Sequence, residues 1–381
     1  MKHLFTSYRF HTKVPFPVHQ ADGIPAVRNT GKTKFYRVSG LAWMIATFCI
    51  MFFTAAQADD QIKRHSEERS FAANVIRTTP DEITINRSGM ESTVPVGDIE
   101  FITYENEPTQ LREGRRSINS GQNEDARDTL LKLKDDMISR NDIKMERDFF
   151  IALANTNIAY QGGDVSLAKA IDGLEKFIKD HPKSYRYYEA LQLLGDLYLQ
   201  TKETKKADTA FTRLSKVESS PTIRAHGCLG KGRVLLTRGK AGATEAQKMY
   251  NEVQKTINAG EISGKMKDMM QLNVTLGLAR CAAYQEKYAE AQKMAQQVID
   301  SVPPEDNQMN ALAFNTLGDA LKRSGKPRDA IVAYLHTHLL YNLDPVLHTE
   351  ALTELINLCR STGDTLKARE LEGIQLERYK R

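Results

Sequence analysis

The chain has 381 residues, with 53 Lys and Arg against 48 Asp and Glu and a formal charge of +5 at pH 7. The basic excess lies in residues 1–58, which hold seven basic residues and one acid, so the rest of the chain carries a formal charge of about −1. A nucleic-acid binder needs a basic surface to meet the phosphates, so we expect no nucleic-acid partner.

The first predicted element is the apolar run from Leu41 to Phe53. It is too short for a comfortable membrane span and has the length of the apolar core of an export signal. Ala56 and Ala58 follow it and supply the small residues that a signal peptidase requires. We therefore predict a signal or targeting segment over residues 1–58, with cleavage after Ala58.

The basic leader ahead of this apolar run is long for a signal. Two alternatives therefore stay open beside cleavage: a later translation start, or an uncleaved anchor that would be the chain's membrane contact. All three place the rest of the chain outside the cytoplasm, in the periplasm or cell envelope.

Residues 59–72 are polar and are predicted to form a flexible linker. Residues 73–105 then show strand-like alternation: Glu82 to Asn86 alternates, Arg87 to Met90 resembles a turn, and Ser92 to Tyr104 offers returning strands. We expect a short β-strand segment that either caps the first helix pair or pairs with a partner's edge.

A two-helix pattern recurs over residues 106–381. Gly195 precedes Ala207 by 12 residues, and Ala207 precedes Phe211 by 4. This spacing predicts an antiparallel helix pair whose backbones approach at the small residues while large side chains fill the space around them. The same intervals separate Gly318, Ala330 and Tyr334, and weaker copies centre on Ala126, Ala170, Ala246, Ala291 and Ala368.

The second-helix alanines of successive copies are 37 to 45 residues apart. We expect the additional residues in the turns, at 239–244 and 260–264.

At these residues the chain resembles the tetratricopeptide repeat (TPR) family, and the run from Leu174 to Ser184 is similar in style to the repeats of exported bacterial envelope proteins. The resemblance implies an all-α fold: a TPR-like α-solenoid of about six to seven antiparallel helix pairs over residues 106–381, with a small N-terminal β segment after the signal peptide. It also implies that the first helices line a concave face on which a partner lies.

Carried over position by position, the resemblance assigns partner binding to polar residues of the first helices. They are Gln192, Asp196, Lys231, Asn273, Arg280, Asn315, Asp319 and Lys322. The paired lysines and asparagines of the family's clamp for a terminal carboxylate are not reproduced, because Gln192 and Asp196 stand in their places.

The function expected from the sequence is that of a non-enzymatic exported scaffold or adaptor that binds a protein or peptide in the cell envelope. The alternative is an accessory binding subunit of a cell-wall or polysaccharide system. We expect no catalytic residues, no cofactor and no metal. His336 and His338, for example, are two residues apart and would point about 200° away from each other on one helix.

Overall fold

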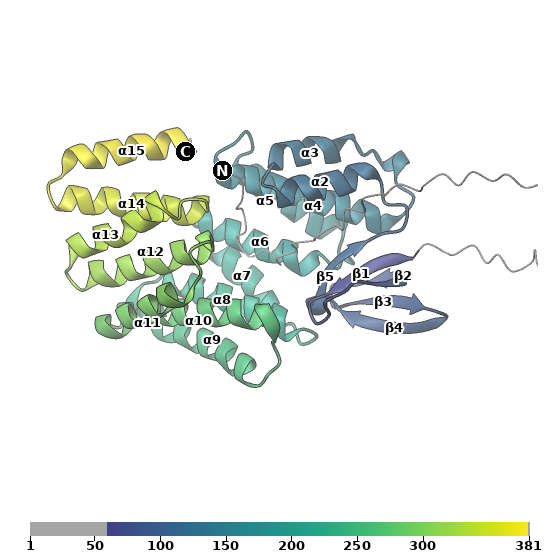
Figure 1. Ribbon diagram of the computed structural model, residues 1–381, viewed down its shortest axis with the longest axis horizontal. Coiled ribbons are helices and arrows are strands. Elements are labelled where there is room, and N and C mark those ends of the chain that lie inside the picture. Colours follow the sequence, from purple (N-terminus) through teal and green to yellow (C-terminus); the bar gives the residue numbers. More distant parts are fainter. Residues whose placement is uncertain (1–58, 380–381) are drawn as a thin grey trace, which may run out of the picture.

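The structure is a computed structural model that describes residues 59–379, and the targeting segment expected over residues 1–58 lies outside them. Figure 1 shows a small sheet beside a long curved stack of helices. The sheet is antiparallel, with the strand order β4-β3-β2-β1-β5. Its elements are β1 (Asp60–Arg64), β2 (Phe71–Thr78), β3 (Glu82–Arg87), β4 (Met90–Pro95), the 3-10 turn η1 (Val96–Asp98) and β5 (Ile99–Thr103).

The strand-turn-strand pattern predicted from the sequence is confirmed by the β3–β4 hairpin. Ile83 pairs with Val94, and the chain reverses at Ser88 and Gly89, which have φ angles of 54° and 86°. Two successive residues with positive φ form the turn whose twist matches that of the flanking strands.

The prediction of a flexible linker over residues 59–72 was wrong where β1 lies, because this strand sits between β2 and β5 inside the sheet. Its Asp60 side chain is fully buried. The carboxylate accepts hydrogen bonds from the backbone N–H of Val75 at 2.9 Å and of Glu105 at 2.8 Å, and from Arg140 Nη1 at 2.7 Å. These partners are remote in sequence, so local polarity gave no sign of the strand.

Fourteen helices follow within the described residues and form seven antiparallel pairs, which confirms the predicted α-solenoid. None of the described helices is both long enough and apolar enough to cross a membrane. The pairs are α2 (Thr109–Asn119) with α3 (Asn123–Lys132), α4 (Asn141–Gln161) with α5 (Leu167–Asp180), α6 (Tyr187–Gln200) with α7 (Thr204–Ser215), α8 (Pro221–Leu236) with α9 (Lys240–Asn258), α10 (Gly264–Tyr284) with α11 (Tyr288–Ser301), α12 (Asn307–Arg323) with α13 (Pro327–Leu339), and α14 (Pro345–Ser361) with α15 (Thr365–Tyr379).

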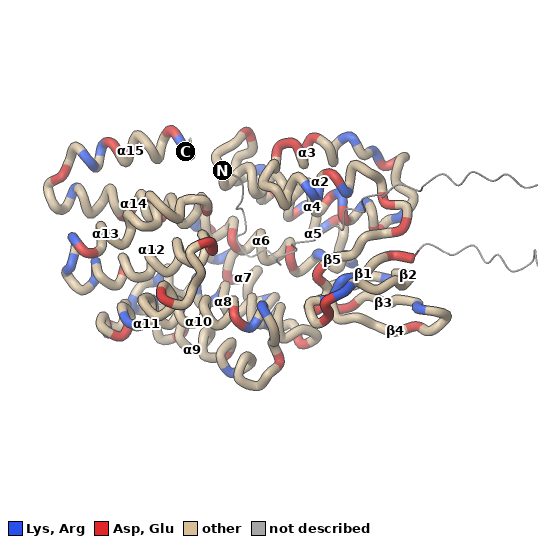
Figure 2. The backbone as a smooth tube through the Cα atoms, in the orientation of Figure 1, with Lys and Arg blue, Asp and Glu red and all other residues tan. Residues whose placement is uncertain are grey.

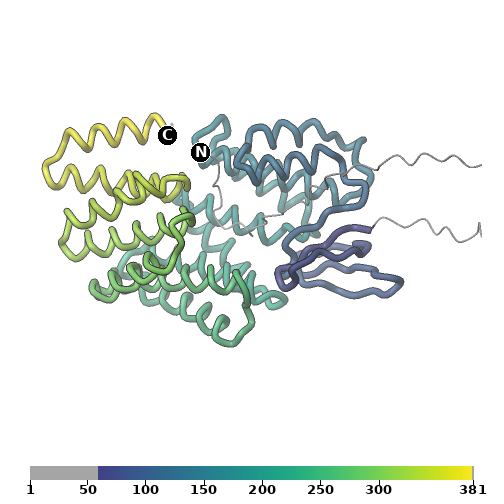
Figure 3. Tube along the Cα trace, viewed as in Figure 1, coloured from purple at the N-terminus to yellow at the C-terminus, as the bar shows by residue number. Residues whose placement is uncertain are grey.

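The pairs follow one another around an arc (Figure 3). Each helix contacts the next one along the chain, and the first helix of each pair also contacts the first helix of the following pair, from α2 and α4 through to α12 and α14. The first helices therefore form one continuous layer.

The additional residues expected in turns at 239–244 and 260–264 mainly lengthen helices. Gly239 reverses the chain with a φ of 61°, and α9 begins at the next residue. As a result α9 has 19 residues and α10 has 21, against 14 in α6.

Phe211 shows why small residues recur at the helix crossings. Its ring is fully buried between Gly195 of α6 and Gly230 of α8. A Cβ atom added at Gly195 would lie 2.7 Å from the ring, and one added at Gly230 would lie 2.1 Å from it. Both distances are too short for non-bonded carbon atoms, so a larger side chain at either position has no room.

One detail of the predicted repeat is corrected by the structure. In the copy that centres on Ala246, the glycines that face the Tyr250 ring are Gly232 of the first helix and Gly277 of the next first helix, whereas Gly230 faces Phe211. Each ring therefore separates the first helix of its own pair from the first helix of the next.

The arc of helices is closed where its last pair returns to the second pair. Helices α14 and α15 both contact α4. At the end of α4, a Cβ atom on Gly162 would lie 2.8 Å from the carbonyl oxygen of Tyr379, the last residue of α15. We call this contact between α4 and the α14–α15 pair the closure contact.

We expect Gly195→Ala to lower the free energy of unfolding by about 1–3 kcal/mol, because the Phe211 ring has no space into which to retreat. Gly173 of α5 is the matched control, since a Cβ atom there meets nothing within 4 Å. Gly173→Ala should raise stability by about 0.5–1 kcal/mol through its effect on helix propensity. Chemical denaturation measures both, and equal effects would contradict the close crossing.

We expect Asp60→Asn to lower stability by about 1.5–3 kcal/mol, because it weakens charge-assisted hydrogen bonds inside the protein. Asp59→Asn changes an exposed neighbour and is the control. Thermal unfolding compares the two, and equal melting temperatures would show that Asp60 does not hold the sheet in place.

Candidate functional site

The candidate site is the layer of first helices, on which all eight predicted binding residues lie. Gln192 and Asp196 are on α6, Lys231 is on α8, and Asn273 and Arg280 are on α10. Asn315, Asp319 and Lys322 are on α12. Lys, Arg, Asp and Glu are interspersed over the described helices (Figure 2).

Two of the eight residues have no hydrogen bond or ion pair with any other residue in the range 59–379. Gln192 is 8% exposed, and Lys231 is partly exposed. Burial of an amide without a partner costs free energy, so Gln192 favours an additional contact with water or a ligand, and the partly exposed Lys231 is open to the same contacts.

Asp196 lies one helical turn after Gln192, and only one of its two carboxylate oxygens accepts a hydrogen bond within the described residues. Arg233 of α8 donates to its Oδ1 at 2.7 Å, whereas its Oδ2 is buried without a hydrogen-bond partner within the described range. Burial raises the pKa of this carboxyl, and the attraction of Arg233 only partly offsets that effect.

Three of the predicted residues are bonded to α14. Arg280 Nη2 lies 3.2 Å from Glu350 Oε1, and its Nε donates to Thr316 Oγ1 at 3.2 Å. Asn315 Nδ2 donates to Glu350 Oε2 at 3.0 Å and to the backbone oxygen of Leu347 at 2.9 Å. This part of the layer is therefore filled by the protein's own groups.

The third of these residues is Lys322, whose Nζ lies 2.8 Å from Glu354 Oε2. The remaining two predicted residues make local contacts. Asp319 pairs with Arg323 at 2.9 Å, and Asn273 Nδ2 donates to the backbone oxygen of Met269 at 2.9 Å.

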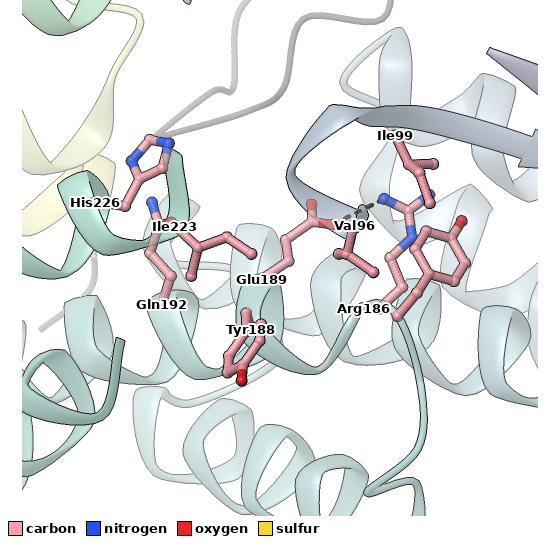
Figure 4. A pocket seen from close by; sticks show the side chains of 9 residues that line it. Val96, Ile99, Arg186, Tyr188, Glu189, Gln192, Ile223 and His226 are labelled. Carbon is pink, nitrogen blue, oxygen red and sulfur yellow. Dashed lines mark hydrogen bonds and ion pairs between the residues drawn. The ribbon is translucent and has the colours of Figure 1, made fainter. Parts of the chain in front are cut away.

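A small hollow of about 30 Å³ lies between the sheet and helices α6 and α8. Figure 4 shows Gln192 extending toward His226, and Arg186 bonded to Glu189 at 2.8 Å. The remaining lining residues are Val96, Ile99, Tyr185, Tyr188 and Ile223.

Of the residues that line this hollow, the sequence pattern predicted only Gln192 as a binding residue. Val96 of η1 and Ile99 of β5 come from the sheet side of the hollow. Two of the contacts that hold the sheet against the helices are made by Asp81. Asp81 of the β2–β3 turn accepts from Tyr188 Oη at 3.1 Å and from Ser219 Oγ at 2.5 Å. Only the tertiary structure brings these residues beside α6, so no sequence pattern marked them.

Within the described residues, no group of three or more His, Cys, Asp or Glu side chains has an arrangement that could hold a metal ion. Cys228, Cys281 and Cys359 are buried and free. His336 and His338 point to different neighbours: His336 stacks on Phe314, whereas His338 is bonded to His348 at 2.8 Å.

We expect the His226 side chain to make stability pH-dependent. Burial, with a smaller contribution from Arg233, lowers the pKa of His226 from 6.5 to about 4. Between these pH values the unfolded chain binds a proton that the folded chain does not, so stability falls with falling pH by up to about 1.4 kcal/mol per unit. Urea denaturation of His226→Gln at several pH values should show a shallower slope, and an unchanged slope would contradict the assignment.

Comparison with protein-family models gives no match, and comparison with curated proteins gives none either. Three solved structures similar to this chain, each 14% identical to it, are a tetratricopeptide repeat protein from Parabacteroides merdae ATCC 43184, a Rap protein complexed with Competence and Sporulation Factor, and NprR in complex with its cognate peptide NprX. Their TM-scores are 0.47, 0.46 and 0.40; they cover 71%, 70% and 72% of this chain, and 96%, 74% and 78% of their own. The seven stacked helix pairs, with small residues at their crossings, make this chain a TPR-like α-solenoid with a small N-terminal sheet.

Proposed function

We propose that this chain is a non-enzymatic scaffold or adaptor that binds a protein or peptide segment on the layer of first helices around α6 and α8. The observation that carries the proposal is Gln192, whose amide lines the hollow and has no hydrogen-bond partner among residues 59–379. A carboxamide offers a donor and an acceptor together, so it matches the backbone amide of an extended segment.

Lys231 lies further along α8, beyond Ile223 and His226, which line the hollow, and would add a charged contact to the proposed site. Its ammonium group forms no ion pair with any described carboxylate, so it is available to a carboxylate or a backbone oxygen of the partner. Val96, Ile99 and Ile223 supply apolar walls near Gln192. A few oriented polar groups beside apolar walls would set the orientation of a segment that lies across the hollow.

The sheet belongs to the proposed binding unit. It forms one wall of the hollow, and its Asp60 carboxylate is bonded to Arg140 beside the start of α4. The partner would therefore contact both the sheet and the solenoid, and loss of the sheet would remove the wall formed by Val96 and Ile99.

We further propose that the chain acts outside the cytoplasm, as an adaptor of the cell envelope. The apolar run from Leu41 to Phe53, followed by Ala56 and Ala58, supports export. The accessory role in a polysaccharide system is the competing proposal, and it requires that capture of the partner depend on glycan.

We expect Gln192→Ala combined with Lys231→Ala to lose a partner that the parent chain captures from cell-envelope extract. The two substitutions remove no hydrogen bond or ion pair within the described residues, so the fold should be retained. Capture on immobilised protein, followed by mass spectrometry, measures the loss, and circular dichroism checks the fold.

The matched control is Gln297→Ala combined with Lys248→Ala, which changes the same residue types at exposed positions on the second helices α11 and α9. The control should keep the partner. If both double variants keep it, the proposed site is wrong. If treatment of the extract with a wall-degrading glycosidase abolishes capture, the polysaccharide role replaces the adaptor role.

A further inference from the structure

The polar groups of α10 and α12 differ from those of α6 in one respect: they already hold carboxylates. Glu350 of α14 accepts from Arg280 at 3.2 Å and from Asn315 at 3.0 Å. One turn later on the same helix, Glu354 accepts from Lys322 at 2.8 Å. The protein thus shows which chemistry this surface recognises, namely two carboxylates spaced four residues apart on a helix.

The Arg280–Glu350 pair depends on how tightly the arc is curved. Arg280 is on α10 and Glu350 is on α14, so the pair reaches past α12. Arg280 also bonds Thr316 of α12, which lies between them. A straighter stack would move α14 away from α10, and the ion pair would then break.

The closure contact maintains that curvature. Gly162 at the end of α4 meets the backbone of Tyr379 at the end of α15, and α14 also contacts α4. Val346 at the start of α14 packs against the large core cluster, which includes α4 and α6 residues. The α14–α15 pair, which makes the closure contact, therefore also carries the carboxylates of Glu350 and Glu354.

We propose that Arg280, Asn315 and Lys322 form a second binding site, for an acidic helical segment of a partner protein, which Glu350 and Glu354 of α14 occupy while the ring is closed. The partner's carboxylates replace those of α14 when the closure contact opens. This inference rests on the proposed binding function and names the chemistry of the partner. Only the open form can bind the partner, so the apparent affinity for the partner falls as the population of the closed form rises.

The test uses a fluorescein-labelled helical peptide with two glutamates four residues apart, and the same peptide with two glutamines. Fluorescence anisotropy with the chain from residue 59 onward measures the affinity. Glu350→Gln should tighten binding of the glutamate peptide by about tenfold or more, because it removes an internal competitor. Arg280→Gln should abolish binding, and the glutamine peptide should bind none of the proteins.

Opening the closure contact should act in the same direction. Gly162→Ala places a Cβ atom 2.8 Å from the Tyr379 carbonyl oxygen and should tighten peptide binding while enlarging the radius of gyration in small-angle scattering. Gly121→Ala is the control, because Gly121 has a similar φ of 79° and nothing within 4 Å of the added atom. The control should change neither quantity.

If Glu350 has only a structural role, Glu350→Gln should lower the melting temperature without increasing the affinity for the glutamate peptide. That result would overturn the proposal. Equal responses to Gly162→Ala and Gly121→Ala would overturn it as well. The capture experiment with Gln192 and Lys231 tests the proposed function separately, because those residues lie on α6 and α8 and neither is bonded to Glu350 or Glu354.

Discussion

The structure depends on one constraint: a single helix pair cannot bury its own apolar surface, so each pair must be covered by another. Phe211 shows how the constraint is met inside the stack, since its ring fills the space between two successive first helices. The ends of the stack have no further pair to cover them. The sheet packs against the early pairs, and the last pair contacts α4, so the chain meets the constraint at both ends with its own residues.

Buried charges join the sheet to the helices and set their orientation. Asp60 and Arg140 form a two-point contact of 2.7 and 3.2 Å. Beside them, the buried guanidinium of Arg186 bonds Glu146 at 3.1 Å and lies 4.7 Å from the centre of the Tyr185 ring. An apolar contact can slide, but a paired charge in the interior has few acceptable positions because separation leaves it unsolvated. The first pair therefore fixes how the sheet meets the start of α4, and the second fixes how α4 meets the start of α6.

The sequence predicted what is local and missed what is distant. The interval from Gly195 through Ala207 to Phe211 lies within one helix pair, so periodicity was sufficient to predict the pair and its crossing. By contrast, Asp60 becomes a buried strand residue through Arg140, 80 positions away, and Arg280 is bonded to Glu350, 70 positions away. The resemblance to the TPR family placed Arg280 on the layer of first helices. The sequence pattern could not predict that Arg280 is already bonded to a carboxylate of the same chain.

This difference divides the layer of first helices into two zones with different energetics. At α6 and α8 a ligand that bonds Gln192 or Lys231 displaces at most water, so nearly all of the new contact energy contributes to affinity. At α10 and α12 a ligand must first displace Glu350 from Arg280 and Asn315, and the displaced carboxylate then needs a new partner. Binding there is an exchange of ion pairs and yields only the difference between two similar contacts. The first zone is suited to binding a partner directly, and the second to binding that depends on the curvature of the arc.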